Sequence, residues 1–211
     1  GFYQISKQVG NLHLTGGHFY DQIGSGIIFR AYEARQLGLD YAVQGFRVKY
    51  DLGNTARVMA FTGLQKDRLG LQNQPIMGLN LEKDFYVNND LAMFTGFGVV
   101  NRTLDQETMN QVAAEINGYP DIEDRFEPRY NYYAFTVYNN LTFKNIGWYT
   151  ELAYKTHEAV RNPEGDRLLD EDGFAIYTAV NYSLKGFGLS VQYRKNRYMD
   201  MRTSPYVDPL E

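Results

Sequence analysis

Seven residues with charged or amide side chains are the best candidates for chemistry in this chain. Each is next to at least one apolar residue, so in a β-strand it would lie on the face opposite to that residue. Mixed charges along such a face would line a water-filled barrel, where rings of charged side chains set the selectivity of a pore. Alternatively, they pair with one another and brace the wall. The set is Arg47, Lys49, Glu82, Glu151, Lys155, Gln192 and Arg194.

The residue types that usually carry catalysis or bind metals are scarce. His13 and His18 are five positions apart, so in a regular strand they point to opposite faces. The chain has no cysteine and no G-x-S-x-G motif. We therefore predict no catalytic residue, no metal ligand and no cofactor. An enzyme embedded in a barrel is an alternative that would need a serine or a carboxylate pair on one rung of the wall.

A glycine-rich passage covers residues 16–26, but it matches no phosphate-binding pattern. Gly24-Ser25-Gly26 belongs to neither G-x-G-x-x-G nor G-x-x-x-x-G-K-[ST]. Glycines permit kinks and bulges, because they have no side chain. Either the chain bends away from its sheet here, into a lumen, or one long strand continues through a bulge. The conformation of residues 16–32 stays open.

The composition narrows the protein class. The 211 residues have a net charge of −4, which argues against nucleic acid as the main partner. The chain has no run of about 18 apolar residues, so no helical membrane span is predicted. Eighteen tyrosines and 13 phenylalanines suit either a sugar-binding β protein or a barrel with aromatic girdles.

Residues 173–196 give the clearest structural signal. Apolar and small or polar residues alternate over two segments of about ten residues, on both sides of a turn at Lys185-Gly186. Each segment is long enough to cross a bilayer when tilted, which takes about 9–11 residues. Similar alternation predicts further strands. They cover residues 2–7, 12–20, 42–50, 55–65, 77–84, 91–100, 130–143 and 148–157.

The predicted connections alternate in length. Those at 51–54, 85–90, 144–147 and 185–186 are short, whereas those at 66–74, 102–129, 158–172 and beyond 199 are longer. Outer-membrane barrels have short periplasmic turns and long outward loops. The longest loop, 102–129, is predicted to be partly helical and extracellular, with a helix over 105–116 and a capping box formed by Thr103 and Gln106.

Five segments carry a family resemblance. Residues 17–33 (GHFYDQIGSGIIFRAYE), with 37–40 (LGLD) and 45–50 (GFRVKY), resemble a large uncharacterised family of Bacteroidota outer-membrane β-barrel proteins. Residues 151–155 (ELAYK) and 182–189 (YSLKGFGL) look like later strands of that family. Its members are considerably longer, so the resemblance implies a part of a longer barrel. It implies a location and a fold, but no activity.

We therefore predict an all-β chain, residues 1–211 forming a single antiparallel up-and-down transmembrane β-barrel domain or part of its wall, with about 8–10 strands. The predicted function is an outer-membrane pore or transport protein, or a subunit of an envelope assembly, and not an enzyme. Its partners would be membrane lipid and other outer-membrane or periplasmic proteins. The alternative is a soluble β-sandwich or jelly-roll module that binds carbohydrate through surface Tyr and Trp148.

Overall fold

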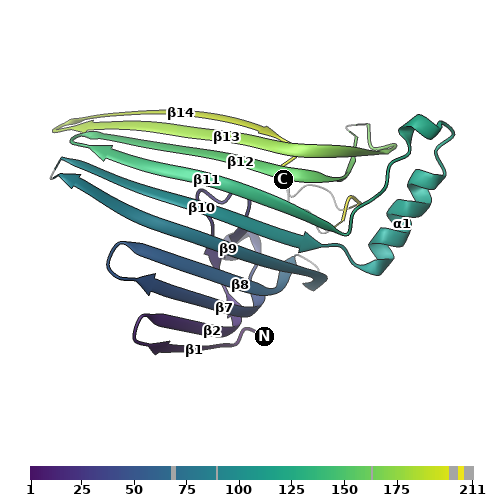
Figure 1. The fold of residues 1–211 in the computed structure, drawn as a ribbon, viewed down its shortest axis with the longest axis horizontal. Coiled ribbons are helices and arrows are strands. Elements are labelled where there is room, and N and C mark those ends of the chain that lie inside the picture. The colour runs from purple at the N-terminus through teal and green to yellow at the C-terminus, as the bar shows by residue number, and fades with distance from the viewer. Residues whose placement is uncertain (68–69, 89, 163, 200–203, 207–211) are drawn as a thin grey trace.

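The computed structural model describes residues 1–67, 70–88, 90–162, 164–199 and 204–206. Its main feature is one antiparallel sheet of ten strands, each paired with its neighbours along the chain (Figure 1). The strands, in sheet order, are β1 (Gln4–Val9), β2 (Leu12–Phe19), β7 (Val43–Leu52), β8 (Ala56–Asp67), β9 (Gly70–Asn88), β10 (Leu91–Thr103), β11 (Asn131–Phe143), β12 (Ile146–Arg161), β13 (Leu168–Leu184) and β14 (Phe187–Arg197). The predicted antiparallel all-β fold is confirmed.

The sheet is open. β1 and β14 each pair on one side only among the described strands, and they lie at opposite edges of the sheet (Figure 1). All residues of both strands are exposed. Closure into a barrel is therefore not seen in this chain and stays a prediction.

The two ends of the sheet differ in their connections. Tight turns join β1 to β2, β7 to β8, β9 to β10, β11 to β12 and β13 to β14, all at the left-hand end in Figure 1. We call this the turn end, and the opposite end the loop end. Residues 20–42, 104–130 and 162–167 connect strands at the loop end, so most of the predicted asymmetry is present.

Two of the predicted long loops are wrong. β9 already begins at Gly70, within the predicted loop 66–74, and Lys66 pairs with Leu71. In the predicted loop 158–172, β12 continues to Arg161 and Glu158 pairs with Glu171. Polar side chains on both faces removed the alternation that marks a strand, but the backbone hydrogen bonds that hold a ladder do not depend on side-chain polarity.

The predicted helix is confirmed as α1 (Gln106–Asn117), but its predicted cap is wrong. Asp105 is the N-cap and accepts a hydrogen bond from the Thr108 backbone N–H at 2.7 Å. Thr103 is the last residue of β10, and its hydroxyl donates to Asn131 instead. Val112 and Ile116 of α1 pack on Ala159 and Leu168, and a short 3-10 helix, η2 (Ile122–Asp124), follows. Among the described residues, no helix is long and apolar enough to cross a membrane.

The two faces of the sheet differ in what covers them. On the outward face, apolar residues pair across neighbouring strands, as Leu81 does with Phe97, and Phe97 with Val137. All three are exposed, with Val137 at 52%. The buried core lies on the opposite, inner face, where it includes Phe61, Val100, Ala134, Ala153 and Ala175.

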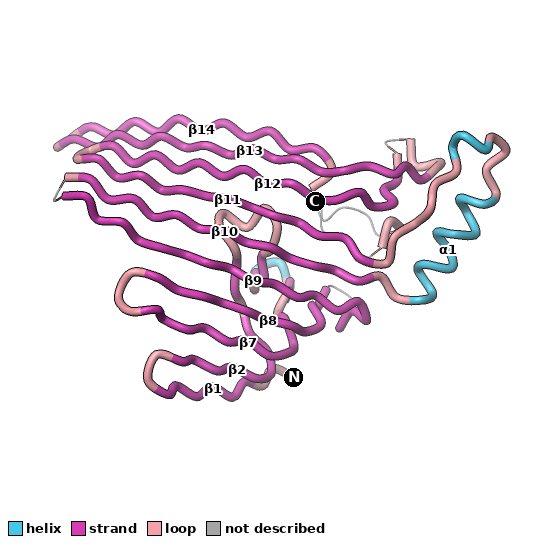
Figure 2. Tube along the Cα trace, viewed as in Figure 1, coloured by secondary structure: helices cyan, strands magenta, loops and turns pink. Residues whose placement is uncertain are grey.

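Residues 20–42, here called the inner segment, leave the sheet after β2 and cover the inner face (Figure 2). The segment holds two small strand pairs and one turn of 3-10 helix. These are β3 (Asp21–Gln22) with β4 (Arg30–Ala31), β5 (Glu33–Ala34) with β6 (Leu39–Asp40), and η1 (Arg35–Leu37). Of the two alternatives left open for residues 16–32, the chain therefore takes the bend.

Ile23, Ile28 and Phe29 of the inner segment are fully or almost fully buried against the sheet. Phe29 stacks on Phe61 of β8 with ring centroids 4.4 Å apart. Gly98 of β10 leaves room for Ile23, because a Cβ at that glycine would collide with the Ile23 side chain. The inner segment is thus packed as part of the core.

Candidate functional site on the inner face

Cross-strand register places several of the predicted site residues on one rung of the inner face. Glu82 of β9 lies opposite Gly96, Gly96 opposite Tyr138, and Tyr138 opposite Glu151. The rung continues from Glu151 through Tyr177 to Arg194 at the β14 edge, and on the other side from Glu82 to Arg57. A rung of mixed charge was expected. Tyr138 and Tyr177 separate its charges, and both were expected on the inward face.

Arg47 and Lys49 of β7 hold the beginning of the inner segment. The Asp21 carboxylate lies 2.7 Å from Arg47 Nη1 and 2.6 Å from Lys49 Nζ. Arg47 also donates to the Tyr20 carbonyl oxygen at 3.2 Å. These two cations are therefore engaged with the segment rather than free to meet a solute.

Asp40 anchors the other end of the segment. Its carboxylate lies 2.9 Å from Lys66 Nζ and accepts hydrogen bonds from the Tyr20 hydroxyl and the Ala42 backbone N–H. Burial alone would raise the pKa of Asp40, but the hydrogen bonds from Lys66, Tyr20 and Ala42 outweigh it and hold the pKa below its ordinary value. For Tyr20, burial and the hydrogen bond to Asp40 raise the pKa to about 12.

Glu151 of β12 binds the middle of the inner segment. Its side chain is fully buried and accepts from the Ser25 backbone N–H at 2.7 Å, the Thr136 hydroxyl at 2.9 Å and the Tyr149 hydroxyl at 2.6 Å. Gly24 lies so close that a Cβ there would be 2.7 Å from Glu151 Oε1. Hydrogen bonds to a carboxylate are stronger than those between neutral groups, so Glu151 anchors the middle of the inner segment to β12.

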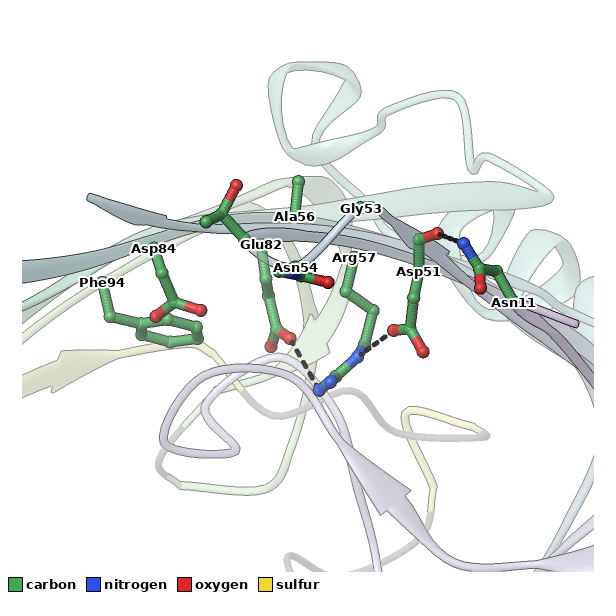
Figure 3. A pocket seen from close by; sticks show the side chains of 10 residues that line it. Asn11, Asp51, Gly53, Asn54, Ala56, Arg57, Glu82, Asp84 and Phe94 are labelled. Atoms are coloured by element: carbon green, nitrogen blue, oxygen red, sulfur yellow. Dashed lines mark hydrogen bonds and ion pairs between the residues drawn. The ribbon is translucent and has the colours of Figure 1, made fainter. Parts of the chain in front are cut away.

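Glu82 lines an open pocket of about 360 Å³ near the turn end (Figure 3). Asp51, Arg57, Glu82, Asp84 and Phe94 extend into it from the same side of the sheet. Arg57 lies 2.9 Å from the Asp51 carboxylate and 3.9 Å from that of Glu82. Three carboxylates around one guanidinium give the pocket an excess of negative charge.

The other three predicted residues, Lys155, Gln192 and Arg194, do not contact the inner segment through any hydrogen bond or ion pair seen among the described residues. Lys155 is fully buried and pairs with Glu158. Gln192 and Arg194 are exposed on the β14 edge, opposite Ala179 and Tyr177. The seven candidates share one face, but the structure does not gather them into a single site.

The histidines are dispersed. His13 lies 3.3 Å from Asp51, His157 lies 3.5 Å from Asp170, and the His18 ring stacks on Phe2. No group of three or more metal-ligating side chains occurs within the part of the chain that the structure describes.

The sequence prediction missed Asp21, Ser25 and Asp40, three residues through which the inner segment makes polar contacts with the wall. Their role depends on the fold of residues 20–42 back onto distant strands, and no local spacing encodes that contact. The only available signal was the cluster of glycines at 24 and 26, which indicated a bend but not its target.

No curated protein and no solved structure matches the chain significantly. One family model matches residues 1–208, and its description is "Family of unknown function (DUF6029)". The predicted relationship to an uncharacterised family is thus supported, whereas the outer-membrane location and the Bacteroidota source stay predictions. The chain belongs to this family of unknown function.

Proposed function

We propose that the ten-stranded sheet is a wall of a bacterial outer-membrane β-barrel whose interior passes small solutes. The observation that carries the proposal is the exposed apolar outward face, opposite an inner face that holds the charged side chains and is covered by the inner segment. An antiparallel sheet in water normally buries its apolar face and solvates the other. An apolar face of this extent is normally shielded from water. For a sheet of long, regular strands, membrane lipid is the environment that shields it.

The spacing of aromatic residues on β11 agrees with the thickness of a membrane. Tyr133 and Phe143 are both exposed on the outward face, ten residues apart. Ten residues of strand span about 33 Å. At a tilt of about 40° this becomes about 25 Å, the height of the apolar band in outer-membrane barrels.

Two pairs of polar side chains on the outward face are satisfied within the sheet. Asn139 donates to the Thr95 hydroxyl at 2.7 Å, and Trp148 Nε1 donates to the Thr178 hydroxyl at 2.9 Å. Such lateral pairing is what a lipid-facing surface requires, because lipid offers no hydrogen-bond partner. A surface facing water has no such requirement.

The interior offers a restricted passage rather than a wide one. The inner segment covers the middle of the inner face, whereas the Asp51–Arg57–Glu82 pocket stays open at the turn end. A carboxylate-rich entrance favours cations over anions. We therefore expect small, cation-preferring conductances.

Planar-bilayer recording of the purified full chain tests this function. The proposal predicts discrete channels whose preference for cations falls in Glu82→Gln and in Asp84→Asn. A bilayer in which correctly inserted protein gives no channels would overturn the pore while leaving the membrane wall intact.

A subunit of an envelope assembly is the second candidate function, and the unpaired edges of β1 and β14 favour it. Exposed strand edges template pairing with another chain. The rival soluble carbohydrate-binding module predicts instead that the protein stays in solution without detergent and shows no heat-modifiable migration on a gel.

A further inference from the structure

The inner segment is attached to the sheet by side chains rather than by backbone pairing. Among the described residues, no backbone-to-backbone hydrogen bond connects residues 21–41 to the ten-stranded sheet. Its internal backbone bonds, such as Ile23 to Phe29 and Tyr41 to Tyr32, stay within the segment. The segment can therefore leave the wall without breaking any strand pairing.

Side chains attach the segment at two places with different chemistry. At its ends, Asp21 and Asp40 form ion pairs with Arg47, Lys49 and Lys66. Between its ends, the polar attachments are the hydrogen bond from the Ser25 backbone N–H to Glu151 at 2.7 Å and a longer one, 3.3 Å, from Gln65 Nε2 of β8 to the Arg30 carbonyl oxygen. The ends are adjacent to the strands that continue the chain, β2 and β7, whereas Ser25 reaches β12, five strands away from β7 in the sheet.

Glu151 is suited to hold and release this middle part. It makes no ion pair among the described residues, so three donated hydrogen bonds stabilise its buried charge. One of the three donors, Ser25, belongs to the inner segment, and the other two belong to the wall. When the segment leaves, Thr136 and Tyr149 continue to bind the carboxylate, and water can replace the Ser25 N–H.

We propose that the inner segment is a gate that swings from the wall about its ion-paired ends, with Glu151 as its latch. In the closed position Ile23 and Ser25 lie against β10 and β12 and the interior is narrowed. In the open position the region around Ile23 is exposed to water, while Ala42 at the end of the segment stays packed. The gate controls passage only if the proposed pore exists, but its movement can be measured without any pore.

The absence of cysteine from the chain makes the movement measurable by labelling. Ile23 and Ala42 are both completely buried, so a cysteine at either position reacts with a water-soluble maleimide only when it becomes exposed. Ile23→Cys reports the middle of the segment, and Ala42→Cys reports its end. Protein in detergent or in lipid serves equally, provided that its circular dichroism shows native strand content.

Two variants weaken the latch, one from each side. Glu151→Gln replaces one carboxylate oxygen with an NH2 group. This group is itself a donor and cannot accept the hydrogen bonds that Ser25, Thr136 and Tyr149 donate. Gly24→Ala places a Cβ 2.7 Å from Glu151 Oε1 at a residue whose φ is +55°. Gly38→Ala is the matched control, because Gly38 also has a positive φ, +66°, but nothing lies within 4 Å of its Cβ position. Both Gly24→Ala and Gly38→Ala therefore introduce backbone strain, but only Gly24→Ala also contacts Glu151.

The gate predicts that Glu151→Gln and Gly24→Ala each raise the labelling rate of Ile23→Cys by about tenfold or more, the effect expected for loss of one hydrogen bond to a charged group. Labelling of Ala42→Cys stays slow in both variants, and Gly38→Ala changes neither rate. Equal acceleration at Ile23→Cys and Ala42→Cys would show general loosening and overturn the gate. Unchanged labelling of Ile23→Cys in both latch variants would overturn it as well. A labelling result of the predicted kind combined with no bilayer conductance would retain the gate and refute the pore.

Discussion

Val191 and Gln192 are consecutive residues of β14 with exposed side chains that leave the sheet on opposite faces. Val191 pairs with Val180 on the outward face, and Gln192 pairs with Ala179 on the inner face. Exposure alone therefore does not distinguish the two positions. If both faced water, a charge would be tolerated equally well at each.

The proposed membrane wall predicts different effects of arginine at these two positions. Val191→Arg should destabilise the protein folded in lipid vesicles by about 2–4 kcal/mol, whereas Gln192→Arg should change its stability by less than about 1 kcal/mol. Denaturant titration of folding into vesicles measures both. Equal stability of the two variants would argue that the outward face is not in lipid.

Packing of the inner segment predicts a second difference, between two glycines on the inner face. Gly98→Ala should cost about 1–3 kcal/mol, because its Cβ would overlap Ile23 and force the segment or the strand to move. Gly188→Ala should cost less than about 1 kcal/mol, since nothing lies within 4 Å of its Cβ position. Equilibrium unfolding of the two variants is the measurement, and a Gly98→Ala protein as stable as Gly188→Ala would contradict the packing.

The Tyr20–Asp40 hydrogen bond predicts a pH dependence in alkaline solution. The pKa of Tyr20 is raised from its ordinary value of 10.0 to about 12 in the folded protein, so the unfolded chain loses this proton first. The stabilisation that Tyr20 contributes is therefore complete below pH 10 and is lost as the pH rises toward 12. Subtracting the stability curve of Tyr20→Phe from that of the wild type isolates this loss. A difference that stays constant from pH 9 to 12 would contradict it.

The N-cap of α1 predicts the effect of losing one carboxylate. Asp105→Ala should destabilise α1 by about 1 kcal/mol, because the Thr108 N–H loses its acceptor. Asp105→Asn should restore most of that loss, since an asparagine oxygen also caps a helix. Hydrogen exchange in residues 106–117 reports the change locally, and identical exchange in wild type and Asp105→Ala would show that the cap is dispensable.

The sequence predicted the strands best where one face is apolar and the other polar. The segment around Val191 alternates strictly, with Phe187, Leu189 and Val191 on the outward face and Ser190, Gln192 and Arg194 on the inner face. Near the loop end this constraint disappears, and Lys66 and Glu158 were placed in loops although the ladder continues through both. The strand ends there are determined by backbone hydrogen bonds. These do not depend on residue type, so the sequence pattern does not reveal where the strands end.

The candidate site was predictable only as a face. Alternation correctly grouped Glu82, Glu151 and Arg194, and the register aligned them on one rung. It could not predict that Arg47 and Lys49 both form ion pairs with Asp21, because that contact depends on the fold of the inner segment over distant strands. Capping of α1 by Asp105 rather than Thr103 was missed because both residues precede an equally plausible first turn.

The protein contains a single tryptophan, which allows a direct test of the central claim that the outward face lies in lipid. Trp148 is 49% exposed on that face, near the turn end of β12. In vesicles that contain brominated lipids, the account predicts strong quenching of Trp148 fluorescence and weak quenching by aqueous iodide. Efficient quenching by iodide without quenching by the brominated lipids would place the outward face in water and contradict the account.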